Sequence, residues 1–472
     1  MKRVGSVVLC ALWLALGCAV GPEYQRPAAP LPRAAQYREG WKRATPSDAV
    51  LRGKWWQVFA EPELDALEER LLVDNQTIQQ FVAQYAAARA QIRVVRAGEL
   101  PVASVSPSAS VSRSSGNTGG FGGGRRVTTY QLPLEASWAP DLFGKVQNSV
   151  RAAQYGAQVS AAELEGQKLL AQSALAQSYF ALRGQDALQE LLDATVAADE
   201  QILEATRALY TTGIGTQLAV AQAEQTLLAV RVQVSTAGIQ RAQLEHAIAT
   251  LLGVSATDFS IPKRAALPQP PVIPAGAPSA LLERRPDIAA AERQMAQANA
   301  QIGVGYAAYY PTLTLSASGG FASTALGTLL SWPSRVWALG ASATELLFDG
   351  GARSAQIDQY RASYDASVAS YRQTVLVAFQ QVEDYLSQSR ILAQAVEQQQ
   401  AAVAAAQSAF DAQKVRYDTG IDPYLDLMTE QTLLLEARQS LVGLQVQQMT
   451  AAVLLVEALG GGWHAADLPA PG

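Results

Sequence analysis

The sequence predicts a membrane β-barrel joined to a long α-helical barrel, built from a tandem repeat with four strands and long helical hairpins in each protomer. Three observations predict this class. The Ala-Gln-Ile of residues 90–92 recurs at 300–302, and Pro101 recurs as Pro311, so the chain contains an internal duplication. Residues that alternate between polar and apolar follow each proline, as in β-strands. A long proline-free stretch with apolar residues at a period of seven follows each pair of strands.

The composition suits long helices with small, polar faces. Of the 472 residues, 49% are hydrophobic and only 16% are charged, and Ala and Gln are abundant. Such helices bury little area per residue, so long contacts must compensate. The net charge of −5 and the lack of a basic stripe give no indication of a nucleic-acid partner.

The N-terminus has the features of an export signal. Residues 1–17 are expected to form a signal peptide, because Lys2 and Arg3 precede an apolar run that is too short to span a membrane. Residues 15–18 (Ala-Leu-Gly-Cys) match a bacterial lipobox and predict lipidation of Cys18; an ordinary signal peptide is the alternative. After cleavage Cys18 is the only cysteine left, so no disulfide framework can form.

Residues 18–60 are rich in Pro, Arg and Trp, and we expect a lipidated, extended arm that lies on the body of the protein. No later stretch is apolar and long enough to suggest a membrane-spanning helix. A chain of this kind that crosses a membrane has to do so as β-strands.

The first repeat is expected at residues 61–260. A helix begins at Glu61 and continues to about Leu100, and strands follow at about 102–115 and 126–139. Serines occupy one side of the first strand and apolar residues the other, as in membrane barrels. A soluble β-sandwich alternates equally well, so the strands alone leave both classes open.

A helical hairpin at about 145–252, with a turn at 211–216, completes the first repeat, and a Pro-rich linker spans 261–280. The Gly-rich residues 119–124 lack the Lys-Ser/Thr of a phosphate-binding loop and are expected to form a flexible connection.

The second repeat, at 281–460, keeps the same order. It begins with a helix at Arg-Arg-Pro-Asp, followed by strands at about 312–323 and 334–347, a hairpin at about 351–459 and a C-terminal tail at 461–472. A coiled-coil rod would explain the period of seven in the helices. It would not explain four membrane-type strands at their far ends.

Four strands cannot close a barrel, and an open sheet edge is not tolerated in lipid. The protomer is therefore expected to oligomerise, and the strand count is compatible with two, three or four copies.

Five segments carry a resemblance to a known family: residues 17–24, the Trp55-Trp56 pair, 141–144 (Asp-Leu-Phe-Gly), 283–299 with its Arg-Arg-Pro-Asp-Ile core, and 417–427. With them the chain resembles the outer-membrane efflux proteins (TolC-like), and most closely the lipoprotein branch that serves resistance-nodulation-division pumps. The resemblance implies a homotrimer in the bacterial outer membrane whose helices extend into the periplasm. It also implies a periplasmic adaptor and an inner-membrane pump as partners, outer-membrane lipid around the barrel, and no cofactor besides the lipid on Cys18.

The resemblance further implies a gate at the periplasmic hairpin tips. In the family an aspartate six residues past the tip glycine contributes to a constriction ring, and that position here is Asp426, counted from Gly420. Asp418 and Asp422 are further gate candidates, for which ordinary solvated charges are the alternative. The first repeat has Ala219 at the matching position, which disfavours a second ring.

The adaptor is expected to touch the same tips. The candidate contact residues, which combine turn glycines with the last tyrosine of each period-seven series, are Gly213, Gly215, Gly420, Tyr210 and Tyr417. Packing within the helix pairs is the alternative for the tyrosines.

No catalytic constellation is visible. His246 and His464 have no Cys or acidic cluster at ligand spacing, so neither an enzyme nor a metal site is predicted.

Three functions are compatible with the sequence. An exit duct that passively conducts small molecules for a tripartite efflux pump is preferred. The alternatives are an exit duct for type I protein secretion and an envelope-spanning lipoprotein without a pore.

Overall fold

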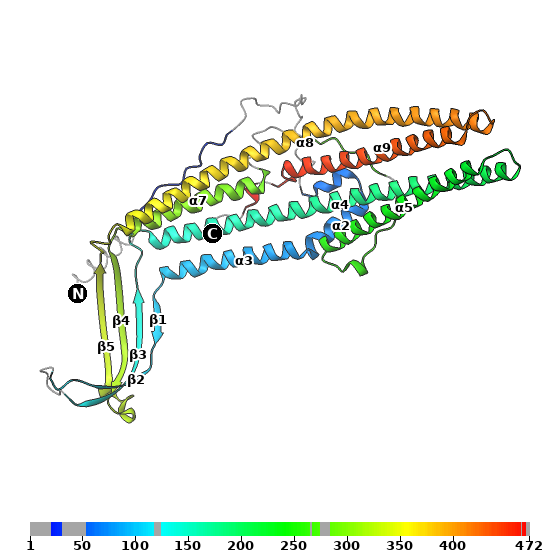
Figure 1. Ribbon diagram of the computed structural model, residues 1–472. Helices are drawn as coiled ribbons and strands as arrows, with labels where there is room; N and C mark the ends of the chain where they lie inside the picture. The colour runs from blue at the N-terminus through cyan, green and yellow to red at the C-terminus, as the bar shows by residue number, and fades with distance from the viewer. Residues whose placement is uncertain are drawn as a thin grey trace.

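The computed structural model describes residues 20–30, 53–117, 124–264, 267–273, 284–463 and 465–468. They form a long helical body with a single sheet at one end (Figure 1). The predicted signal peptide, Cys18, His464 and most of the predicted arm lie outside the described residues.

The N-terminal part of the body is a short helical unit that packs against the long helices. It consists of η2 (Trp55–Phe59), α2 (Pro62–Asp74), α3 (Gln76–Arg96) and η3 (Ala97–Glu99). The single helix predicted from Glu61 to Leu100 is therefore wrong. Asn75 leaves the helical conformation, and its side chain accepts the backbone N–H of Ile78 at 2.9 Å, which caps a new helix.

The sheet is antiparallel, with the strand order β1–β3–β4–β5 and β2 also paired to β3. Its strands are β1 (Val102–Val105), β2 (Ser108–Arg113), β3 (Arg126–Trp138), β4 (Thr312–Ser323) and β5 (Arg335–Thr344). β5 is shorter than the predicted 334–347, and its link to β4 contains η6 (Leu326–Thr328) and η7 (Trp332–Ser334).

β1 and β2 correspond to the one strand predicted at 102–115, and the prediction of an unbroken strand is wrong. Their register against β3 is unchanged across the gap, so the two segments lie on one line. Ser106 N–H still donates to the Pro133 carbonyl at 3.3 Å, whereas Pro107 has no N–H to continue the ladder. Alternation therefore continues through the interruption.

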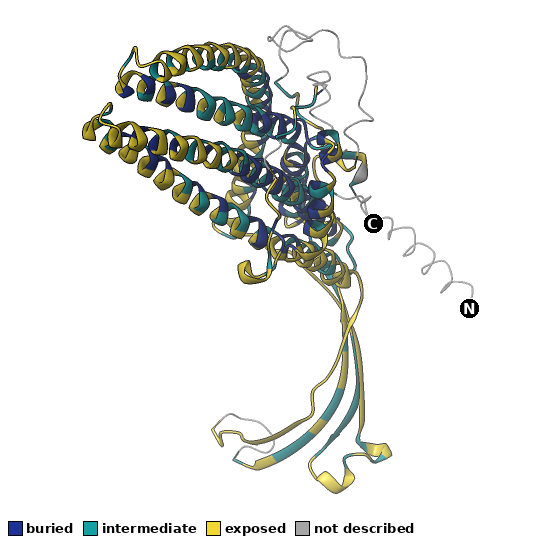
Figure 2. Cartoon of the chain, turned by 90° about the vertical axis from the view of Figure 1, so that its right-hand side faces the viewer, coloured by how far each residue is buried: buried dark blue, intermediate teal, exposed yellow. Residues whose placement is uncertain are grey.

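The register sorts the sheet into two chemically different faces. Ser104, Glu135, Ser318 and Ala338 lie side by side on what we call the polar face. The opposite, apolar face carries large side chains with no cover within one chain; Trp337 is 79% and Leu339 is 75% exposed. Its members include Tyr130, Leu132, Leu134, Trp138, Leu315, Phe321, Trp337 and Leu339. Figure 2 shows the contrast between this exposed sheet and the buried interior of the helical body.

Two helical hairpins of equal size form the body. α4 (Lys145–Thr211) and α8 (Ala352–Asp418) each have 67 residues, whereas α5 (Gln217–Leu251) and α9 (Tyr424–Ala458) each have 35. α7 (Pro286–Ala307) packs between α4 and α8 and leads into β4. The remaining short elements are η4 (Ala256–Asp258) and η8 (Ala465–Asp467).

The main core lies at the middle of the body, where the short helical unit meets both hairpins. Trp55, Trp56 and Phe59 are buried there beside Phe180 of α4. The Trp55 indole donates to Gln172 at 3.1 Å, so its N–H is satisfied in the interior.

A buried ionic network fixes the segment that follows α5. Asp186 accepts from Arg183 at 2.9 Å and from Arg241 at 2.7 Å. The same guanidinium groups donate to the carbonyls of Pro262 and Ile261, at 2.8 and 2.6 Å. Since each buried charge is paired and hydrogen-bonded, the start of the Pro-rich linker is held on α4 and α5.

The described part of the arm, residues 20–30, is extended and lies on the helices close to the sheet. Val20 N–H donates to the Phe143 carbonyl at 3.3 Å, and Asn148 donates to the Val20 carbonyl at 3.0 Å. Asn299 of α7 donates to the Pro22 carbonyl at 2.9 Å. The arm is therefore tied to both repeats at the junction of strands and helices.

α9 is the one described helix whose length and composition would allow a membrane crossing. By length and composition, the expectation that no stretch after the N-terminal segment could form a membrane-spanning helix is therefore wrong. The C-terminal part of α9 packs into the main core, where Met449, Val453 and Val456 are buried, so its apolar residues are used inside the body.

Candidate functional site

The two hairpin tips at the far end of the body from the sheet are built from the same turn. Gly213 and Gly420 follow the long helices with φ of +79° and +72°, a conformation that favours glycine. Their N–H groups donate to the carbonyls of Tyr210 and Tyr417, at 3.0 and 2.9 Å. A Cβ on Gly215 would lie 2.9 Å from the Tyr210 nitrogen, so only glycine fits this close approach. All the predicted tip glycines thus have a backbone role.

The second tip differs from the first because it contains an ion pair. Arg416 donates to both carboxylate oxygens of Asp422, at 2.5 and 2.8 Å, and Gln413 adds a bond of 2.9 Å. The hydrogen bonds from Arg416 lower the pKa of Asp422 below its usual value. Asp422 is therefore a paired charge that closes the turn.

Asp418 and Asp426 are placed differently. Asp418, at the end of α8, is exposed and pairs with Lys414 at 2.7 Å, which is an ordinary i,i+4 surface bridge. Asp426 lies exposed in the first turn of α9, where the N-terminus of the helix favours a negative charge. Within the described chain no hydrogen bond or ion pair to its carboxylate is found. Of the three gate candidates, Asp426 alone presents an uncommitted charge.

The two tip tyrosines have different surroundings. Tyr417 hydrogen-bonds to Thr206 of the other hairpin at 3.1 Å and packs edge-on to buried Tyr424 at 5.9 Å. Tyr210 is 46% exposed and free to meet another protein. Packing thus explains Tyr417 but not Tyr210.

A buried polar pair that the sequence does not predict lies behind the tips. Asp199 of α4 is 3% exposed and Gln431 of α9 is 7% exposed, and the Gln431 amide donates to the Asp199 carboxylate. Burial raises the pKa of Asp199 to about 6. In the sequence Asp199 stands beside Glu200 and has the pattern of a solvated charge run, so no local signal distinguishes it.

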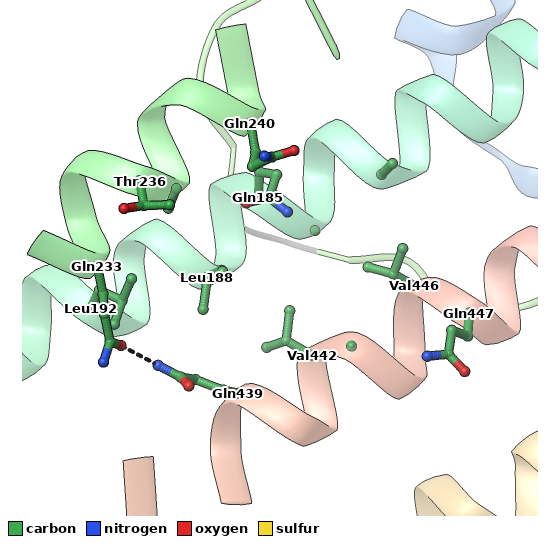
Figure 3. Close-up of a pocket in the computed structure, with 14 residues that line it drawn as sticks. Gln185, Leu188, Leu192, Gln233, Thr236, Gln240, Gln439, Val442, Val446 and Gln447 are labelled. Atoms are coloured by element: carbon green, nitrogen blue, oxygen red, sulfur yellow. Dashed lines mark hydrogen bonds between the residues drawn. The ribbon is translucent and has the colours of Figure 1, made fainter. Parts of the chain in front are cut away.

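A cavity of about 580 Å³ lies further along the contact between the hairpins. Figure 3 shows glutamines and aliphatic side chains of α4, α5 and α9 around it, with Gln439 donating to Gln233 at 2.8 Å. In its wall α4 and α9 approach so closely that a Cβ on Gly184 would overlap Val446. We call this contact of α4 and α5 with α9 the seam.

His246 is exposed on α5, and no group of three or more potential metal ligands occurs within the described residues. No chemistry of a metal or acid–base site is therefore assigned to them.

An amphipathic sheet with two open edges, attached to a long helical body, is the architecture expected of one subunit of an envelope-spanning membrane duct. A family model described as "Outer membrane efflux protein" matches residues 67–254 and 277–461, one repeat each. The chain belongs to the outer membrane efflux protein family.

Individual relatives agree with this family assignment. The chain is 31% identical to the "Probable efflux pump outer membrane protein TtgC" of Pseudomonas putida, over 98% of this chain and 96% of the relative. It is also 31% identical to the "Pyoverdine export outer membrane protein OpmQ" of Pseudomonas aeruginosa, over 98% of each.

Solved structures show the same fold. The outer-membrane channel OprN superposes with a TM-score of 0.84 at 27% identity, covering 94% of this chain and 100% of the channel. The open Neisseria gonorrhoeae MtrE outer membrane channel gives 0.83 at 27% identity, covering 95% and 99%. The predicted fold class and family are confirmed, and the protein is an outer-membrane efflux channel component, not an enzyme. The matches give no support to the secretion alternative.

Proposed function

We propose that three copies of this chain close into one lipid-anchored duct that carries small organic molecules out of the periplasm. The observation that carries the proposal is the sheet with two open edges, one formed by β1 and β2 and the other by β5. An outer-membrane protein cannot leave such edges unpaired in lipid. Pairing β5 of one copy with β1 and β2 of the next satisfies both edges.

The size of the lumen supports three copies. Each chain contributes four strand positions, since β1 and β2 share one line. Two copies would give eight strands, whose lumen side chains nearly fill, whereas three give twelve and leave room for a solute. Three is the smallest number that makes a duct. The polar face, with Ser104 and Glu135, would line it, and the apolar face would meet lipid.

The arm supports lipidation of Cys18. Val20 is bonded to Phe143 beside the start of α4, where strands change to helices. A lipid on Cys18 would start only two residues away, close to the membrane boundary. Radiolabelled palmitate should be incorporated by the wild type and not by Cys18→Ser; equal incorporation would remove the lipid anchor from the proposal.

The tips would meet a periplasmic adaptor, which links the duct to a resistance-nodulation-division pump in the inner membrane. Exposed apolar side chains support this role at both tips, since Ile214 is 78% and Ile421 is 64% exposed. Three copies would bring three Asp426 carboxylates together at the opening, which favours cations and resists tight closure. OpmQ is a pyoverdine export protein by name, and two further Pseudomonas putida relatives are named as outer membrane proteins of an antibiotic efflux pump (ArpC) and of a toluene efflux pump (TtgC of a second strain). In this chain's complex the pump would choose the cargo.

The test combines stoichiometry with conduction. Native mass spectrometry of the purified chain should give a trimer, and planar bilayers should show discrete conductance. Asp426→Ala should lower the open probability, because the repulsion that resists closure is lost, and should weaken the cation preference. Asp418→Ala, at an exposed paired charge, should change neither. A monomer, or a trimer without conductance in either wild type or variant, would refute the duct.

A further inference from the structure

Asp199 and Gln431 connect the two hairpins at a point enclosed by apolar side chains. On one side lie Leu203 and Leu427, which belong to the cluster behind the tips. On the other lie Leu192 and Leu435, which belong to the next cluster along the seam. The pair is thus a polar contact between two apolar clusters along the contact of α4 with α9.

The hydrogen-bonding of this pair is incomplete in a specific way. One Asp199 oxygen accepts from the Gln431 amide, but the other oxygen, Oδ2, has no partner in the described chain. The Gln431 carbonyl oxygen, Oε1, also has no partner there. Two acceptors cannot hydrogen-bond to each other. When Oδ2 of Asp199 carries a proton, it can donate to Oε1 of Gln431, because a carboxylic acid and a primary amide form two hydrogen bonds.

The neighbouring charged groups do not compete for this site. On α4, Glu200 is bound to Arg231 of α5 at 2.6 Å, and both side chains are about half exposed. Tyr424 on α9 is the titratable group whose charge couples to Asp199, and burial raises the pKa of this phenol, so it stays neutral near pH 7. α8 approaches this part of α4 through Tyr417, which is bound to Thr206.

We propose that Asp199 and Gln431 form a proton-dependent latch that holds the two hairpins together along the seam and so favours the closed duct at acidic pH. The proposal rests on the duct function proposed above and names positioning residues for its gate. Opening of a duct at its tips requires the hairpins to shift relative to each other, and that shift would expose this pair to water.

The direction of the pH effect follows from linkage. Burial raises the pKa of Asp199 from an ordinary value of 3.8 to about 6. Protonation therefore favours the buried, closed arrangement, and the preference is lost as the pH rises through about 6. Above that value both arrangements are ionised and nothing further changes. Between pH 7.5 and 5.0 the ratio of closed to open duct should rise about tenfold, since one pKa unit corresponds to a factor of ten.

The test uses the purified full-length chain in planar bilayers at pH 7.5 and 5.0. For the wild type, the ratio of closed to open time should rise about tenfold from pH 7.5 to pH 5.0. Asp199→Asn reproduces the shape and both hydrogen bonds of the protonated acid, so it should be mostly closed at both pH values. Adding Gln431→Leu to that variant should abolish the closed preference. Glu204→Gln, at an exposed carboxylate on the same helix, should respond like the wild type.

Hydrogen–deuterium exchange over residues 424–435 gives a readout that does not need conduction. After correction for intrinsic rates, the wild type should be more protected at pH 5.0 and Asp199→Asn equally protected at both. If the wild type and Asp199→Asn respond alike to pH in both measurements, the latch is refuted. If exchange shows the pH difference but no variant conducts, the latch stands and the duct function fails.

Discussion

Arg416 binds Asp422 through both carboxylate oxygens, across the turn that joins α8 to α9. The first hairpin has Gly215 and Thr216 in this part of its turn and no such pair. The two tips therefore share a backbone but differ in what holds them closed.

Loss of this pair should loosen the second tip alone. Asp422→Asn removes the charge and one of the two guanidinium bonds, so amide exchange over residues 413–424 should rise several-fold. Exchange over 206–217 should not change. Because the pKa of Asp422 is lowered, the wild-type pair is present above the usual carboxylate range and is lost only as the pH falls below it. The tip itself should thus be insensitive between pH 5 and 8, and a tip that loosens in that range contradicts the prediction.

Glu68 is a buried carboxyl that weakens the fold. It is fully buried in α2, neither carboxylate oxygen has a partner in the described chain, and burial raises its pKa well above 4.5. Stability should therefore decrease as the pH rises from 4.5 towards the raised value. Glu68→Leu removes the unpaired group and should stabilise the chain by about 1–3 kcal/mol.

Thermal melting in detergent measures this effect. The gain in melting temperature should grow with pH for Glu68→Leu, whereas Glu69→Gln, at an exposed site, should change little. A variant that melts below the wild type at pH 8 would show that Glu68 has a favourable partner.

Gly21 passes directly over Gly303 of α7 where the arm crosses the helices. A Cβ on Gly21 would lie 2.7 Å from the Gly303 Cα, and Gly21 has a φ of +145°. Gly21→Ala should therefore lift the arm from its groove, at a cost of about 1–3 kcal/mol. Chymotrypsin should then cleave faster after Tyr24, whose ring is half-buried in the wild type. Gly116→Ala, in open space, is the matched control, and equal cleavage in all three proteins would show that the arm is not held there.

The two faces of β5 offer a matched pair of substitutions. Leu339 is on the apolar face and Ala338, its neighbour, is on the polar face beside Ser318. Leu339→Lys should cost about 2–4 kcal/mol if it lies near the middle of the membrane, and should reduce the amount of heat-resistant oligomer in outer membranes. Ala338→Lys should assemble normally and shift conductance towards anions. If Ala338→Lys reduced the amount of oligomer and Leu339→Lys did not, the polar and apolar faces of the sheet would be assigned the wrong way round.

Periodicity and proline carried most of the fold information in the sequence. Pro101 and Pro311 lie shortly after the last helical residues, Glu99 and Ala307, and precede alternating residues. The change from helix to strand is therefore a local event that the sequence pattern indicates. The breaks at Asn75 and Pro107 were missed because the apolar pattern continues across each of them. A side-chain cap or a missing N–H changes the hydrogen bonds without changing that pattern.

The site was only partly predictable for a different reason. The turn glycines are defined by local backbone conformation, so they could be found. Asp199 contacts Gln431 from 232 positions away, and Gly21 approaches Gly303 from 282 positions away (303 − 21). Such long-range contacts depend on how the repeats pack, which no local pattern encodes.

The matched helices also restrict how a protein of this kind can change length. α4 has the same number of residues as α8, and α5 has the same number as α9, so both tips end at a common distance from the membrane. Seven residues added to α8 and α9 alone would make one tip protrude by about 10 Å. A partner that seats on a level rim would then touch only half of it. To span a wider or narrower envelope, insertions or deletions would have to occur in both halves of the gene together, in steps that keep the seven-residue phase.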